Sequence, residues 1–72
     1  MIIKLQGKPA EMECKIVVTR DGAEVYNAMV TTGTSQITIP GQTGLGLVKY
    51  TVSALTPDGQ AVETWEVEVN FD

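Results

Sequence analysis

The sequence predicts a small, all-β, antiparallel fold, and three observations support this prediction. The first is a long β-hairpin between residues 47 and 71, whose two arms alternate apolar and polar residues. The second is a series of shorter alternating segments before it, separated by turn residues. The third is that no window shows the 3.6-residue spacing of a core helix. Several short antiparallel strands divided by turns are typical of a β-sandwich or a small barrel.

The long hairpin is the clearest single element. Apolar or aromatic residues occupy every second position of both arms: Val48, Tyr50, Val52 and Ala54, then Trp65, Val67, Val69 and Phe71. Because successive side chains of a strand point to opposite faces, one face of this hairpin is predicted to be buried. Residues 57–59 (Pro-Asp-Gly) supply the corner, the side-chain hydrogen bond and the positive φ that a turn needs. We therefore expect Tyr50 and Trp65 in the core.

Four shorter strands are expected at residues 2–6, 12–19, 24–32 and 36–39. The Asp-Gly pair at 21–22 is a strong signal for a tight hairpin between the second and third of them. On the third strand, Tyr26, Ala28 and Val30 are preferred as the buried face, and the opposite face stays open as an alternative. The glycine-rich segment 41–46 is interpreted as a crossover between sheets, because it lacks the spacing and the lysine of a phosphate-binding loop.

Composition limits the possible partners and cofactors. The 72 residues predict one domain, residues 1–72, and a single cysteine without any histidine predicts no disulfide, no metal site and no cofactor. Cys14 is interpreted as a small buried hydrophobe. The net charge of −4, with five scattered basic residues, argues against nucleic acid. No apolar run suits a membrane span, and no secretory signal is seen, so we expect a complete protein made in the cytoplasm rather than an excised domain.

The segment 50–54 (Tyr-Thr-Val-Ser-Ala), followed by a turn and a valine-rich last strand, resembles the immunoglobulin-like β-sandwich superfamily. The closest likeness is to compact bacterial and phage immunoglobulin-like and fibronectin type III-like domains. The resemblance implies a sandwich of about six to seven strands, with Tyr50 at the tyrosine-corner position and Cys14 lying across from Val52. The third-strand tryptophan of the family is missing. Since the fold typically has about 100 residues, edge strands are expected to be short or missing.

The candidate functional residues are those that depart from the core pattern. Leu45, Leu47 and Leu55 lie in the glycine-rich loop or near the ends of the penultimate strand, where they could converge into a docking patch. Tyr26 is a core residue or, if it faces outward, a contact anchor. Glu66 and Glu68, with Glu63 nearby, could form an acid–base or calcium site. We prefer to interpret them as charges that solubilise an exposed face and protect a sheet edge.

An enzyme is the least expected class, because the sequence has no histidine and no nucleophile with a candidate base. The chain is also too short to enclose a substrate pocket. The leading hypothesis is a non-enzymatic binding module: a phage virion decoration, or capsid cement, protein that docks on an assembled shell inside the host cytoplasm. Docking on a rigid lattice would stabilise so small a domain. The alternatives are a cytoplasmic inhibitor or regulatory binder of one soluble protein, and an excised adhesion or carbohydrate-binding domain. Self-association stays open.

Overall fold

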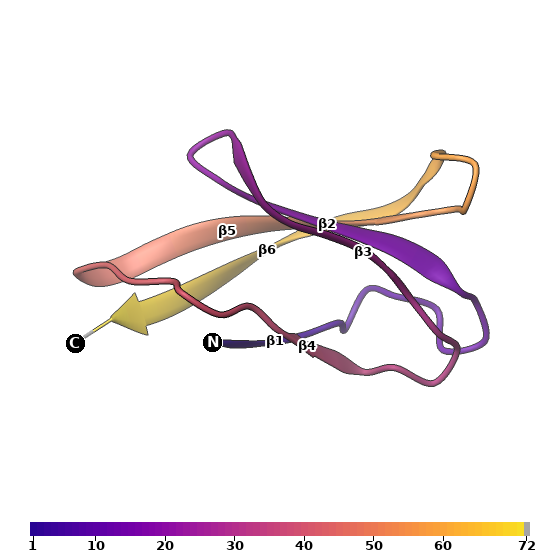
Figure 1. Ribbon diagram of the computed structural model, residues 1–72, viewed down its shortest axis with the longest axis horizontal. Helices are drawn as coiled ribbons and strands as arrows, with labels where there is room; N and C mark the ends of the chain where they lie inside the picture. Colours follow the sequence, from indigo (N-terminus) through magenta and orange to yellow (C-terminus); the bar gives the residue numbers. More distant parts are fainter. Residues whose placement is uncertain (72) are drawn as a thin grey trace.

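Residues 1–71, the part of the chain described by the computed structural model, form six strands in two antiparallel sheets and no helix. Strands β3, β2, β5 and β6 make a four-stranded sheet, in that order, and β1 pairs with β4. Figure 1 shows the small sheet lying below the large, twisted one. The strands are β1 (Ile2–Lys4), β2 (Cys14–Arg20), β3 (Ala23–Val30), β4 (Gln36–Thr38), β5 (Gly46–Leu55) and β6 (Ala61–Phe71). The predicted all-β, antiparallel class is thus confirmed.

Two hairpins build the four-stranded sheet, both at the predicted turns. Between β2 and β3, Asp21 and Gly22 adopt positive φ angles of 52° and 79°, the backbone that a two-residue turn requires. Between β5 and β6, the amide of Gly59 donates to the carbonyl of Thr56 at 2.8 Å. The two hairpins then join through β2 and β5, where Val18 lies opposite Val52 and Ile16 opposite Ala54.

The small sheet closes the other side of the core. Its register places Ile3 opposite Ile37, and both side chains are buried. The pairing extends past the strand ends, since the amide of Ile39 donates to the carbonyl of Met1 and the amide of Leu5 to the carbonyl of Ser35, each at 2.8 Å. These two hydrogen bonds extend the β1–β4 pairing, which has three residue pairs, to residues 1–5 and 35–39.

The core lies between the two sheets and follows the period-two pattern of the strands. Its buried apolar residues are Ile3, Leu5, Cys14, Ile16, Val18, Val30, Ile37, Ile39, Tyr50, Val52 and Ala54. Fully burying one aliphatic side chain of this kind contributes about 1.5–3 kcal/mol. Tyr50 is buried as expected, whereas Trp65 packs against the core but stays partly exposed, because β6 is an edge strand.

The buried face of β3 agrees with the preferred interpretation. Tyr26 lies opposite Val18 and Ala28 opposite Ile16, so these side chains share the core face. A register irregularity between Val18 and Thr19 turns Val25 toward the core as well. Such irregularities add a residue to one strand and break strict alternation.

The placement of Cys14 corrects one implication of the family resemblance. Cys14 is buried and free, as expected. It does not lie across from Val52: it begins β2, a neighbour of β5 in the same sheet, and the residue opposite Val52 is Val18. The second strand of this chain belongs to the sheet of the penultimate strand, so the two side chains cannot face each other between layers.

Candidate functional site

The most exposed apolar side chains of the described chain gather where the crossover loop enters β5. The loop, residues 39–45, leads from the small sheet to the large one. Gly41 within it and Gly46, the first residue of β5, have φ angles of 77° and 65°. Leu45 is 93% exposed and Leu47 is 67% exposed. Positive φ angles of this kind are ordinary for glycine and costly for other residues, so the glycines determine the path of the loop.

The loop is fixed to the large sheet by a chain of side-chain hydrogen bonds. The Tyr50 hydroxyl donates to Oε1 of Gln42 at 2.8 Å, and it accepts from Nη1 of Arg20 at 3.2 Å. The same Nη1 also donates to the carbonyl of Thr43. Since Arg20 lies directly opposite Tyr50 in the β2–β5 register, the sheet itself brings these two anchor side chains together.

Aromatic packing completes this anchor. The guanidinium carbon of Arg20 lies 5.8 Å from the ring centroid of Tyr50 and 5.7 Å from that of Phe71. A cation this close to a ring face is attracted to it by about 0.5–1 kcal/mol at an exposed site. The backbone of Gly44 closes over the group: an added Cβ would lie 3.0 Å from Cδ2 of Phe71 and 3.1 Å from Nη2 of Arg20.

An anchored loop matters for binding because ordering a loose segment costs free energy when a partner docks. Here Gln42, Thr43 and Gly44 are already held against the sheet, and Leu45 follows directly with its side chain in solvent. Leu47 begins the outer face of β5, where it lies opposite Asn70. The loop therefore presents two neighbouring apolar side chains on a prearranged support.

The four candidate residues from the sequence fall into two groups. Leu45 and Leu47 lie on either side of Gly46, the first residue of β5, and both are exposed. Leu55 ends the same ten-residue strand at its other end, which places it about 26 Å from Leu47 at the usual rise per residue, and it is half-buried. Tyr26 lies on β3, two strands away from β5, with its ring packed against the core. The structure thus does not gather Leu55 or Tyr26 with the loop.

The anchor residues were not found from the sequence. Arg20 ends β2, directly before the Asp-Gly turn, and Gln42 lies in a loop rich in glycine. The conspicuous signal was the aromatic pattern of Tyr50 and Phe71, which predicted burial alone. Only the pairing of β2 with β5 reveals that a hydroxyl, a guanidinium and an amide meet at one end of the sheet.

The acidic residues Glu66 and Glu68 of β6 lie beside Lys49 of β5. Lys49 and Glu66 approach at 4.0 Å with both side chains more than half exposed, and this is the one ion pair within residues 1–71. Such a surface pair contributes about 0–1 kcal/mol. The described residues contain no cavity and no group of three His, Cys, Asp or Glu side chains placed to hold a metal.

No helix within residues 1–71 has the length and apolarity to cross a membrane.

Comparisons of this chain with protein-family models, with curated proteins and with solved structures find no match. We therefore infer its function from the geometry of the loop and the sheet edges.

Proposed function

We propose that this chain is a non-enzymatic protein-binding module that docks through its crossover loop, with Leu45 and Leu47 as the contact residues. The observation that supports this proposal is that Leu45, 93% exposed, follows directly on a loop segment fixed by Arg20 and Tyr50. Covering an exposed leucine contributes about 1.5–3 kcal/mol. Two adjacent leucines on a prearranged support gain most of that free energy, because little ordering is needed.

We further propose that the fold is a reduced immunoglobulin-like sandwich. The order β3-β2-β5-β6 corresponds to strands C′-C-F-G of that fold, and the β1–β4 pair corresponds to B-E, with strands A and D missing. Tyr50 would then lie on strand F, after the corner that joins E to F. Its hydroxyl bonds back to Gln42, eight residues upstream, as a tyrosine corner does, although here to a side chain.

As the partner we propose the assembled shell of a phage virion, so that the chain acts as a decoration protein. The resemblance of the penultimate strand to phage immunoglobulin-like domains supports this choice, and so does the physics of a lattice. Each copy of a small domain needs one complementary site, and binding stabilises its folded state by mass action. A repeated, rigid surface offers that site many times without the ordering cost of a flexible partner.

The test is co-sedimentation of the purified chain with shells from the organism that encodes it. A variant carrying both Leu45→Asp and Leu47→Asp removes the contact, and Met29→Asp is the matched control. Met29 is 47% exposed on the same sheet, opposite Lys15 at the end far from the loop.

We expect the unaltered chain and the Met29→Asp control to sediment with shells at a fixed ratio per subunit, and the double variant to remain in the supernatant. If the unaltered chain ignores shells, the virion partner is wrong and a soluble target protein becomes the next candidate. If the double variant sediments as well as the control does, the loop is not the contact.

A further inference from the structure

Strand β6 is an open edge of the large sheet. Within residues 1–71 its backbone pairs only with β5, and no loop donates a hydrogen bond to it. In an antiparallel strand, every second residue directs its N–H and C=O away from the paired neighbour, so β6 carries a row of such groups on its free side. Its pairing is regular over residues 63–71, whereas the opposite edge, β3, is interrupted by the irregularity beside Thr19.

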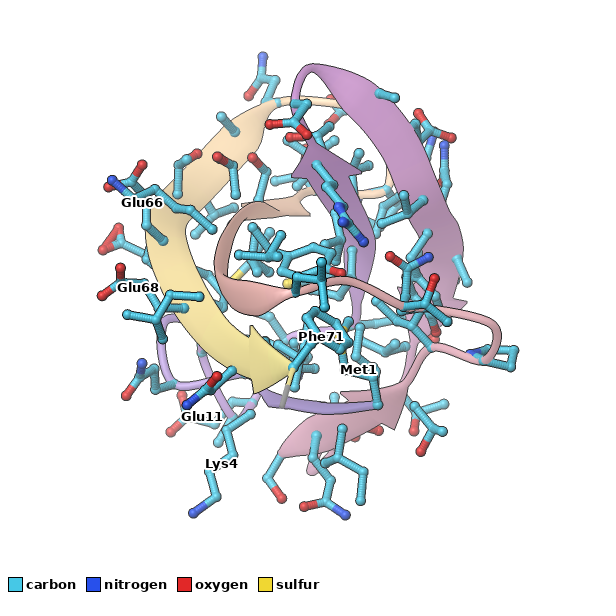
Figure 2. All side chains as sticks on the ribbon, turned by 90° about the vertical axis from the view of Figure 1, so that its left-hand side faces the viewer. Met1, Lys4, Glu11, Glu66, Glu68 and Phe71 are labelled. Atoms are coloured by element: carbon cyan, nitrogen blue, oxygen red, sulfur yellow. The ribbon has the colours of Figure 1, made fainter. Side chains whose placement is uncertain are left out.

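The inner face of β6 is apolar and incompletely covered. Trp65, Val67, Val69 and Phe71 pack against the core but remain half-buried. Among their partners on β5, Tyr50 and Val52 are completely buried, because β2 pairs with β5 on its other side there, whereas Val48 is half-buried and Gly46 is exposed. In Figure 2, Phe71 is directed toward the interior at the end of this apolar row. A further strand alongside β6 would cover this row as β6 covers β5.

The outer face of β6 is acidic. Glu66 and Glu68 point away from the interior in Figure 2, and β6 contains no lysine or arginine. The register places Glu63 on the other face, opposite Ala54. On β5, Lys49 lies opposite Glu68 in the register, and its Nζ is 4.0 Å from Oε2 of Glu66. One positive charge therefore lies beside two carboxylates. The charge left on this face is negative.

These charges disfavour three of the registers in which a second copy of the chain could occupy the edge. Antiparallel pairing of β6 with itself, centred on Val67, would set Glu66 opposite Glu68 in both directions. Centring the pair on either glutamate would set that residue opposite itself. Like charges directly opposite each other destabilise a strand pair. Lysine or arginine at the same places would instead form opposite-charge pairs, which stabilise it.

We propose that β6 is a docking edge for an extended segment of a partner protein in which lysine or arginine alternates with apolar residues. The backbone of that segment extends the sheet, its apolar side chains cover the row from Trp65 to Phe71, and its basic side chains lie beside Glu66 and Glu68. Strand addition of this kind takes its affinity from main-chain hydrogen bonds and its specificity from alternate side chains. This surface meets the loop anchor at Phe71 and runs along β6 to Trp65, and the inference does not depend on the proposed shell partner.

The test uses a synthetic peptide of alternating valine and lysine, matched in length to the regular part of β6, with a valine–glutamate peptide as the reference. Trp65 is the one tryptophan of the chain and lies on the strand to be covered, so its fluorescence reports binding. We expect a change in this fluorescence on binding, and an affinity for the lysine peptide about tenfold or more above that for the reference at low salt. High salt should reduce this difference in affinity, because the charges on β6 and on the peptide are exposed to solvent and therefore screened.

Two controls separate strand addition from general attraction of a cationic peptide. N-methylation of alternate peptide residues removes either the amides that pair with β6 or those that face away. We expect one of the two methylated peptides to lose binding and the other to retain it. Equal binding of both would overturn the proposal, as would a lysine peptide that does not bind.

Charge reversal on the protein supplies the second control. The double variant Glu66→Lys, Glu68→Lys should reverse the preference between the two peptides, whereas Glu24→Lys, on the exposed edge strand β3, should leave it unchanged. Circular dichroism checks that each variant keeps its fold, which is expected because all three side chains are exposed. If reversal at β6 leaves the preference unaltered, or if Glu24→Lys shifts it equally, the edge is not the binding surface.

Discussion

Gly7→Ala should destabilise this domain through a single steric contact. Gly7 lies between β1 and β2 with its backbone against the indole of Trp65. A Cβ built there would lie 2.4 Å from Cε3 and 2.6 Å from Cζ3 of that ring, whereas carbon atoms in favourable contact are about 3.5–4.0 Å apart. The φ angle of Gly7 is outside the left-handed region, so alanine suits the backbone and the clash is the only obstacle.

The magnitude follows from two opposing terms. Inserting a carbon into a packed contact costs about 1–3 kcal/mol, because the ring or the loop must move. Replacing glycine also restricts the unfolded chain, which returns about 0.4–1 kcal/mol. The free energy of unfolding should therefore fall by about 1–2 kcal/mol. In a domain of this size, about 1 kcal/mol shifts Tm by about 4–8 °C, so the melting temperature should fall by about 5–15 °C.

The assay is urea and thermal unfolding followed by circular dichroism, in a double-mutant cycle with Trp65→Val. Without the indole, Gly7→Ala should cost nothing or stabilise slightly, so the coupling between the two sites should equal nearly the whole cost. Gly33→Ala serves as the control, since its φ of 81° makes alanine strained while no atom lies within 4 Å of the added Cβ. Its cost should not depend on Trp65. An equal cost of Gly7→Ala in both backgrounds would refute the contact.

Further substitutions test the core and the loop anchor. Leu45→Asp and Leu47→Asp should each lower the free energy of unfolding by less than about 1 kcal/mol in urea titrations, because both side chains are mainly exposed; a loss of several kcal/mol would place them in the core. Val52→Asp should abolish folding by burying an unpaired charge, and a native-like spectrum would contradict this. Tyr50→Phe should cost about 0.5–1.5 kcal/mol and speed amide exchange in residues 42–45; unchanged exchange would contradict the anchor. Lys8 is buried, so Lys8→Met should alter stability less than Lys8→Ala does, because its stem packs; equal costs would contradict this.

The local part of the fold could be predicted from the sequence. Alternation around Tyr50 and Val67, together with the Asp-Gly and Pro-Asp-Gly turns, determines two hairpins whose strands are neighbours in the chain. The pairing of β2 with β5 joins segments far apart in the sequence, and no local pattern specifies it. The implied position of Cys14 across from Val52 failed for that reason, since strand order decides which residues oppose each other.

Part of the candidate site could likewise be predicted from the sequence, and part could not. The exposure of Leu45 and Leu47 followed from their place in a glycine-rich loop and off the alternation of β5. The separation of Leu55 depends on the length of β5, which runs from Gly46 to Leu55 without a break. The role of Arg20 could not be predicted, because its hydrogen-bond partners lie on another strand and in a loop. Side-chain hydrogen bonds between distant segments produce no periodic pattern in the sequence.

The glutamates on the open edge strand β6 are compatible with two roles. Glu66 and Glu68 were interpreted as charges that keep an edge strand from pairing, and their exposed positions on β6 agree with this role. The same charges leave the edge free for a strand of opposite charge. The sequence could not show that the row from Trp65 to Phe71 stays half-buried. That exposure depends on the position of β6 at the edge of the sheet, which the strand order determines.

Site-specific photo-crosslinking tests the docking of the loop most directly. A photoreactive amino acid replaces Leu45 in one preparation and Met29 in another, and each is irradiated in the presence of assembled shells. If the loop docks as proposed, position 45 should form a covalent adduct with the shell subunit and position 29 should not. Absence of an adduct from position 45, or equal adducts from both positions, would contradict a docking surface at Leu45 and Leu47.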